Sequence, residues 1–190
     1  DTTFTNRGFN DNKGDNDNWS TSGRLLFRQR LGKAGRTISA NINYSFSNNE
    51  MAGLNQSLTQ TDFDQDGVYD NDIVNQRFDQ LSTNSSLSGR LVYTEPLAQT
   101  LFLEASYQYS WNLNKSKKDT YNSGSNDFST SDMMYDYKGE VYDPTYSSSI
   151  VNRYINQRAG LTLSWQKEKI NAQIGAQLNP TNTYNETNGK

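Results

Sequence analysis

Residues 37–47 alternate without a break between apolar and polar side chains. Successive side chains of an extended chain point to opposite sides, so this segment has one apolar side and one uncharged polar side. Its eleven residues exceed the about five or six residues of an ordinary strand. They match the roughly ten-residue strands of a transmembrane barrel, in which one side faces lipid and the other faces the lumen. The apolar positions are Ile38, Ala40, Ile42, Tyr44 and Phe46.

The same two-residue period returns in five other segments and predicts an all-β chain with about six long antiparallel strands. The predicted strands span about residues 19–31, 37–47, 80–94, 100–113, 152–166 and 170–179. We expect one apolar set to face outward together, on the side opposite Asn43, Glu104 and Gln173. This set is Ile42, Tyr44, Leu103, Ala105, Leu161 and Ile174.

Short and long connections alternate between these segments. We expect tight turns at 32–36, 95–99 and 166–170, and long loops at about 48–79 and 114–151. Bacterial outer-membrane barrels combine short periplasmic turns with long extracellular loops in this way. Six strands cannot close, because spanning barrels have about eight strands or more and an open edge in lipid leaves backbone groups unpaired. We therefore expect a partial transmembrane barrel, without a plug domain, from a larger exported polypeptide.

A soluble six-stranded sandwich also buries one side of each strand and is the alternative fold. The length of the strands favours the barrel. Aromatic residues also gather near the predicted strand ends, where the interfacial girdles of a barrel lie. No apolar run in the chain is long enough for a transmembrane helix.

The composition narrows the possible functions. Hydrophobic residues make up 32% of the chain, and the polar remainder is mostly Asn, Ser, Thr and Gln instead of runs of charge. A net charge of −3 argues against a general nucleic-acid surface. The chain has no Cys and no His, which excludes disulfides and thiolate metal sites and removes the commonest general base. No spacing marks a carboxylate pair or a Ser–Lys set, so we do not expect an enzyme.

Two neighbouring segments carry a family resemblance. L-V-Y-T-E-P-L-A-Q-T-L-F-L-E-A-S-Y-Q-Y-S at 91–110, followed by N-L-N-K-S-K-K-D-T-Y at 112–121, resembles the barrel of Bacteroidetes-type TonB-dependent outer-membrane receptors. The resemblance implies a wall segment of a 22-stranded, plugged barrel that imports a ligand across the bacterial outer membrane. It implies as partners the outer-membrane lipid, the barrel's own plug domain, the TonB complex and a surface lipoprotein. Nucleic acid is not an expected partner.

Two other functions stay open beside import. One is a non-transporting outer-membrane scaffold or a secretion-associated barrel. The other is a soluble extracellular calcium-binding β-sandwich that acts as an adhesin or glycan binder.

The segment T-D-F-D-Q-D-G-V-Y-D-N-D at 61–72 resembles the first half of a calcium loop. Alternating carboxylates converge on a hard cation, and the glycine permits the tight turn. The twelfth position is Ile73 in place of the usual Glu, so a later aspartate has to complete the site. A solvated acidic loop is the alternative, and we expect no cofactor other than Ca²⁺. The candidate ligands are Asp62, Asp64, Asp66, the main-chain carbonyl near Val68, Asp70 and Asp72.

The polar side of the predicted strands gathers charge near the short turns. In a large barrel such side chains line the lumen and either pair with a plug or orient an anionic ligand. Ordinary solvation of the wall and pairing between strands are the alternative. The residues are Arg24, Arg28, Arg30, Arg90, Glu104 and Arg158.

Overall fold

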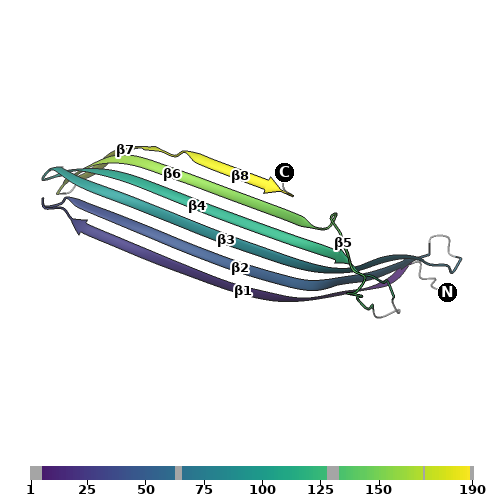
Figure 1. Cartoon of the computed structure of the whole chain (residues 1–190). Helices are drawn as coiled ribbons and strands as arrows, with labels where there is room; N and C mark the ends of the chain where they lie inside the picture. Colours follow the sequence, from purple (N-terminus) through teal and green to yellow (C-terminus); the bar gives the residue numbers. More distant parts are fainter. Residues whose placement is uncertain (1–5, 63–65, 128–132, 169, 189–190) are drawn as a thin grey trace.

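The computed structural model describes residues 6–62, 66–127, 133–168 and 170–188, which form one antiparallel sheet (Figure 1). The sheet order is β1-β2-β3-β4-β6-β7, while β5 pairs with β4 and β8 pairs with β6. No helix able to cross a membrane occurs in these residues. The strands are β1 (Asn6–Arg30), β2 (Thr37–Thr61), β3 (Asp70–Ala98), β4 (Leu101–Asn122), β5 (Val141–Tyr142), β6 (Ser148–Lys167), β7 (Ile170–Leu178) and β8 (Thr181–Thr187).

The all-β class and the antiparallel pairing of the six predicted strands in chain order are confirmed. Figure 1 shows the three short turns together at one end of the sheet. The first turn contains Gly32 and Gly35, both with positive φ, a conformation that glycine adopts without steric cost. The turn predicted at 95–99 is shorter than expected, because β3 continues to Ala98 with a register shift after Pro96.

The predicted long loops are wrong in their extent. The segment 48–79 is mostly strand, since β2 runs to Thr61 and β3 begins at Asp70. The loop predicted at 114–151 is reduced to 123–147, which includes the short β5. Apolar alternation stops well before these strands end. Backbone hydrogen bonds continue there between polar residues, because the ladder itself does not require apolar side chains.

A further strand, β8, continues the sheet beyond the predicted end at 179. It pairs with β6 in the same register as β7, so that the two form one edge strand interrupted at Asn179–Pro180. Pro180 has no N–H to give to β6, but its carbonyl accepts the Gln157 N–H at 2.9 Å. The interruption is therefore local.

Residues that pair with one another across neighbouring strands form what we call a row. These pairings place the six residues predicted to face outward on one face of the sheet. We call this the belt face and the opposite one the polar face. Apolar side chains of the belt face stay open to the surroundings, with exposed fractions of 64% for Leu25 and 74% for Ile174. They form a belt across six strands: Trp19–Phe27 in β1, Ile38–Phe46 in β2, Leu81–Tyr93 in β3, Leu101–Leu113 in β4, Ile155–Trp165 in β6 and Ile170–Leu178 in β7.

The belt runs obliquely across the strands. Its midpoint in β1, Gly23, lies in the row that reaches β6 at Ile155. Its midpoint in β7, Ile174, pairs with Leu163 of β6, eight residues further along that strand. Eight residues span about 26 Å along a strand, and the five strand-to-strand steps span about 24 Å across the sheet. The strands are therefore tilted by about 45° from the direction perpendicular to the belt.

Apart from Pro96 at the short-turn end, the buried residues among those described lie beyond the belt, at the opposite end of the sheet. There the connection 123–147 packs on β2 and β3. The Gln56 amide donates to Asn75 Oδ1 at 2.9 Å and to the Met133 carbonyl at 3.0 Å. Gln56 and Asn75 are 3% and 4% exposed. This small core is therefore held largely by satisfied amide groups.

At the other end, an ion pair ties two short turns together. Arg36 donates to both Glu95 oxygens, at 2.7 Å from Nε and 2.9 Å from Nη2. Lys33 Nζ lies 3.5 Å from Glu95 and donates to the Pro96 carbonyl at 2.5 Å. The hydrogen bonds from Arg36, with a further one from Tyr93, lower the pKa of Glu95 to about 2.

Candidate functional site on the polar face

All six charged residues predicted for the lumen side lie on the polar face. Arg90 pairs with Asn41 and Gln108, and Arg158 also pairs with Gln108, so that the two arginines occupy one row. Glu104 lies nearby on β4. Arg24, Arg28 and Arg30 are on the edge strand β1, two strands away from Arg90. Among the described strand residues, the only other carboxylates on this face are Asp70 and Asp72, at the far end of β3.

Two asparagines, Asn41 on β2 and Asn179 between β7 and β8, hold two of these arginines in the same way. Arg24 Nε donates to Asn41 Oδ1 at 3.1 Å, and Arg158 Nε donates to Asn179 Oδ1 at 3.1 Å. A guanidinium held through Nε keeps both terminal nitrogens free to donate, which is the geometry that binds a carboxylate or phosphate through two oxygens. Within the part of the chain that the structure describes, the two terminal nitrogens (Nη1 and Nη2) of Arg24 and those of Arg158 have no protein acceptor.

A hollow of about 400 Å³ lies between Arg90 and Arg158. Small residues on adjacent strands, Ser106 and Gly160, form part of its floor and leave the space between the two guanidinium groups open. Glu104 lines the same hollow, and its carboxylate lies 4.0 Å from Arg90 Nη2. Both side chains of this pair are well exposed, so the interaction between them is weak.

Uncharged polar side chains pair across β2 and β3 on this face. Ser45 and Ser86 share a hydrogen bond of 2.7 Å between their hydroxyls, and Asn43 donates to Ser88 at 3.3 Å. Such cross-strand pairs stabilise a sheet whose polar side is in water.

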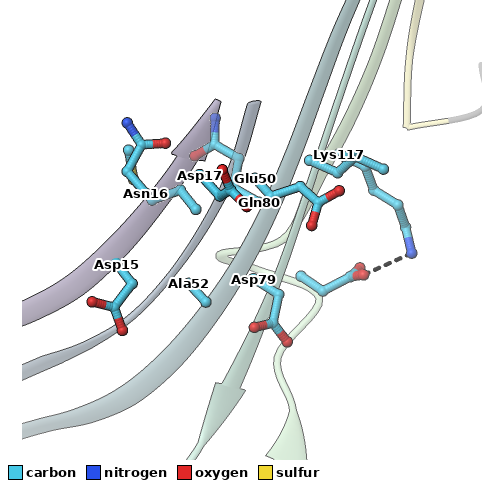
Figure 2. A pocket seen from close by; sticks show the side chains of 11 residues that line it. Asp15, Asn16, Asp17, Glu50, Ala52, Asp79, Gln80 and Lys117 are labelled. Carbon is cyan, nitrogen blue, oxygen red and sulfur yellow. Dashed lines mark hydrogen bonds and ion pairs between the residues drawn. The ribbon is translucent and has the colours of Figure 1, made fainter. Parts of the chain in front are cut away.

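A second hollow, of about 660 Å³, lies on the belt face just beyond the belt (Figure 2). Its charged lining comes from two adjacent rows. One row contains Asp17, Glu50 and Lys117, and the next contains Asp79 and Asp119. Lys117 donates to Asp119 at 2.7 Å, which raises the pKa of the lysine. Within the described ranges, no three acidic side chains converge closely enough to hold a metal ion. Sequence reasoning missed this hollow because it treated these residues as parts of loops.

Arg77 of β3 holds the connection 123–147 against the sheet. It donates to Glu140 at 3.0 Å from Nε and 2.9 Å from Nη2, it pairs with Asp79, and it lies 4.5 Å over the Tyr121 ring. The bonds from Arg77 lower the pKa of Glu140. Burial, followed by a hydrogen bond to Glu140, raises the pKa of Tyr135 to about 12. The sequence shows no local sign of this clamp, because residues 77 and 140 are far apart in the chain.

The residues predicted to bind calcium lie between β2 and β3 and at the start of β3. Asp62 is 7% exposed, and its oxygens accept the N–H groups of Asp66 at 3.2 Å and Gly67 at 2.9 Å. Asp66 in turn accepts the Val68 N–H at 2.8 Å.

Asp70 and Asp72 belong to β3 and pair with Thr61 and Thr59. Asp64 lies outside the described residues. In the part of the chain that the structure describes, the aspartates Asp62 and Asp66 therefore close a turn through backbone groups. A calcium site stays a prediction.

Comparison with protein-family models and with curated proteins finds no match to this chain. The geometry of the sheet is therefore the basis for assigning a function.

Proposed function

We propose that this chain forms part of the wall of an outer-membrane β-barrel, in a receptor that imports its ligand by a TonB-dependent mechanism. The observation that carries the proposal is the oblique apolar belt. Strands of transmembrane barrels are tilted by about 35–45° from the membrane normal, so a lipid layer must cross them obliquely. The displacement from Ile155 to Leu163 along β6 corresponds to a tilt of about 45°.

The height of the belt also supports a membrane location. The belt covers nine residues in β2 and thirteen in β4, as the ranges Ile38–Phe46 and Leu101–Leu113 show. At a tilt of about 45° these lengths correspond to roughly 20–30 Å along the membrane normal. The apolar band of an outer-membrane barrel is about 25 Å tall.

The chain's three tryptophans, Trp19, Trp111 and Trp165, fall on the belt face. Trp19 and Trp165 are the terminal residues of the belt in β1 and β6, at opposite borders. Amphipathic aromatic rings of this kind anchor a protein at the two membrane–water interfaces. This arrangement supports a bilayer around the belt.

The polar face supports a wide lumen. Arg24, Arg90 and Arg158 lie directly behind the belt, at the depth of the lipid. Charged groups at that depth require water or a polar partner on their own side of the wall. A wide barrel with a hydrated lumen meets this requirement.

A soluble sandwich is less compatible with these observations. A sandwich requires a second sheet over the apolar face, whereas large apolar side chains of the belt are exposed, among them Leu161 at 57%. The described residues form a single sheet.

Brominated lipids test the membrane location, because they quench only those tryptophans that contact acyl chains. We expect them to quench the native fluorescence of the protein in vesicles, and we expect aqueous iodide to quench it weakly. The matched control is Ser86→Trp in a background where the three tryptophans are Phe. Ser86 lies on the polar face, so iodide should quench this variant more strongly than brominated lipid does. Native fluorescence that responds only to iodide would rule out the proposal.

Conductance measured across planar bilayers distinguishes a plugged receptor from an open scaffold. A plugged receptor should conduct little until urea unfolds its plug, whereas a scaffold without a plug should conduct from the start. High initial conductance that urea does not change would contradict the receptor proposal and leave the barrel assignment in place.

A further inference from the structure

We infer that the hollow between Arg90 and Arg158 binds a small anionic ligand with two carboxylate or phosphate groups. The inference deepens the proposed function, because it names the chemistry of a ligand on the wall of the lumen. It rests on that function only in requiring that the polar face be in contact with water.

The spacing of the two arginines fits two anionic groups on one molecule. Arg90 and Arg158 share a row and are separated by one strand, which carries Gln108. Two strand spacings place their Cα atoms about 10 Å apart. The hollow of about 400 Å³ between them is large enough for a short dicarboxylate or a diphosphate. Gln108 stands between them in the row and lines the hollow; its amide donates weakly to Ser110 at 3.4 Å and has a second N–H and an oxygen with which to bind the middle of such a ligand.

The chemistry of the charged groups also favours an anion. Arginine keeps its charge at any working pH, and its planar fork matches carboxylate and phosphate oxygens. Asn179 fixes the orientation of Arg158 through Nε at 3.1 Å, so its terminal nitrogens are presented to the hollow at a reduced entropic cost. The three arginines of β1 add positive potential on the same face and attract an anion toward it.

Glu104 provides a substitution that should strengthen anion binding instead of weakening it. Its carboxylate lies 4.0 Å from Arg90 and competes with a ligand for that guanidinium. Removing its charge with Glu104→Gln should therefore strengthen binding of an anion. If the arginines served only to solvate the wall, this substitution would not change the affinity for any small anion.

The experiment is calorimetric titration of the intact barrel protein in detergent with glutarate, with pyrophosphate and with a neutral disaccharide. We expect heat with at least one of the two anions and none with the sugar. The stronger of the two anions identifies the carboxylate or the phosphate class. Arg90→Gln and Arg158→Gln should each weaken binding by about tenfold, since each removes a charge-assisted pair of hydrogen bonds. Glu104→Gln should strengthen it several-fold.

Arg153→Gln is the matched control. Arg153 is on β6 as well, but it lies on the belt face beyond the belt, over the Tyr184 ring at 5.2 Å. It should leave anion binding unchanged. Quenching by brominated lipid verifies that each variant is folded and inserted, so loss of binding is separable from failure of the barrel proposal. No heat with either anion, or an equal loss in Arg153→Gln, would overturn the inference.

Discussion

The two halves of β2 follow different physical rules although they belong to one continuous strand. From Ile38 to Phe46 the belt face carries apolar side chains, none of which is buried, with Ile42 and Tyr44 exposed. From Asn48 to Gln60 the same face carries polar side chains beside a few apolar ones, and both Gln56 and Leu58 are nearly fully buried. All buried residues of β2 therefore lie in its second, more polar half.

In a soluble domain the longest apolar run of a strand is normally buried, whereas the apolar half of β2 has no buried residue. This difference is explained if the first half is solvated by lipid and the second half by water and by its own connection. The apolar first half then needs no protein partner, whereas the second half needs hydrogen bonds such as that between Gln56 and Asn75.

The largest expected effect comes from placing one charge in each half of the belt face. Ala105→Arg puts a guanidinium inside the belt and should lower the free energy of unfolding in lipid by about 2–4 kcal/mol. Ala52→Arg puts the same group on the same face beyond the belt, beside Asp15 and Asp79, and should cost about 0–1 kcal/mol. Denaturant unfolding in vesicles measures both. Equal costs would show that lipid does not distinguish the two halves.

A smaller effect is expected where Arg77 clamps the connection 123–147. Arg77→Ala removes both bonds to Glu140 and should increase protease cleavage of the connection by about tenfold, because it opens more often. Cleavage elsewhere should not change. Lys117→Ala is the control, since its ion pair with Asp119 joins two residues of the same strand. Identical cleavage of the two variants would exclude a specific role for the clamp.

Asp62 separates two explanations of the turn between β2 and β3. As an acceptor for two backbone N–H groups, it should cost about 1 kcal/mol of stability when changed to Ala, with or without calcium. If calcium binds as the sequence predicts, calorimetry should show binding heat in the parent protein and none in Asp64→Ala. Absence of calcium heat in both would leave only the backbone role of Asp62.

The smallest effect concerns pH at the short turns. The pKa of Glu95, about 2, lies below its ordinary value of 4.5, so the ion pair with Arg36 is fully stabilising above the ordinary value. Its contribution is lost as the pH falls through about 2. Arg36→Gln should move the pKa of Glu95 back toward 4.5, which carboxyl-carbon NMR can follow. An unchanged value in the variant would mean that Arg36 is not the main cause.

Apolar alternation predicted the strand type and the two faces, since both depend on a period that is visible along the chain, and the tight turns between the segments predicted the strand order. The alternation placed Leu103, Ala105 and Ile174 on one face, as the register does. It ended the second strand at residue 47 because apolar alternation stops there, whereas backbone pairing continues to Thr61 between mostly polar residues.

The candidate site divides in the same way. Alternate residues of a strand point to opposite faces, so the face on which Arg90 and Arg158 lie could be predicted from their positions along the sequence. Their common row with Gln108 depends on the cross-strand register, which the turns and ladders fix only in the folded sheet. The clamp between Arg77 and Glu140 depends on the path of a connection and has no periodic signal.

The position of Pro180 leaves every backbone N–H and C=O group on the free edge of β7 and β8 available for hydrogen bonding. In an antiparallel ladder, alternate residues direct both backbone groups to the same neighbour. The bond from Gln157 to the Pro180 carbonyl shows that residue 180 directs its groups inward, to β6. The outward groups come from the odd-numbered residues between 171 and 187, none of which is proline. A neighbouring strand can therefore hydrogen-bond to this edge along its whole length, and a proline one position earlier or later would have left a gap there.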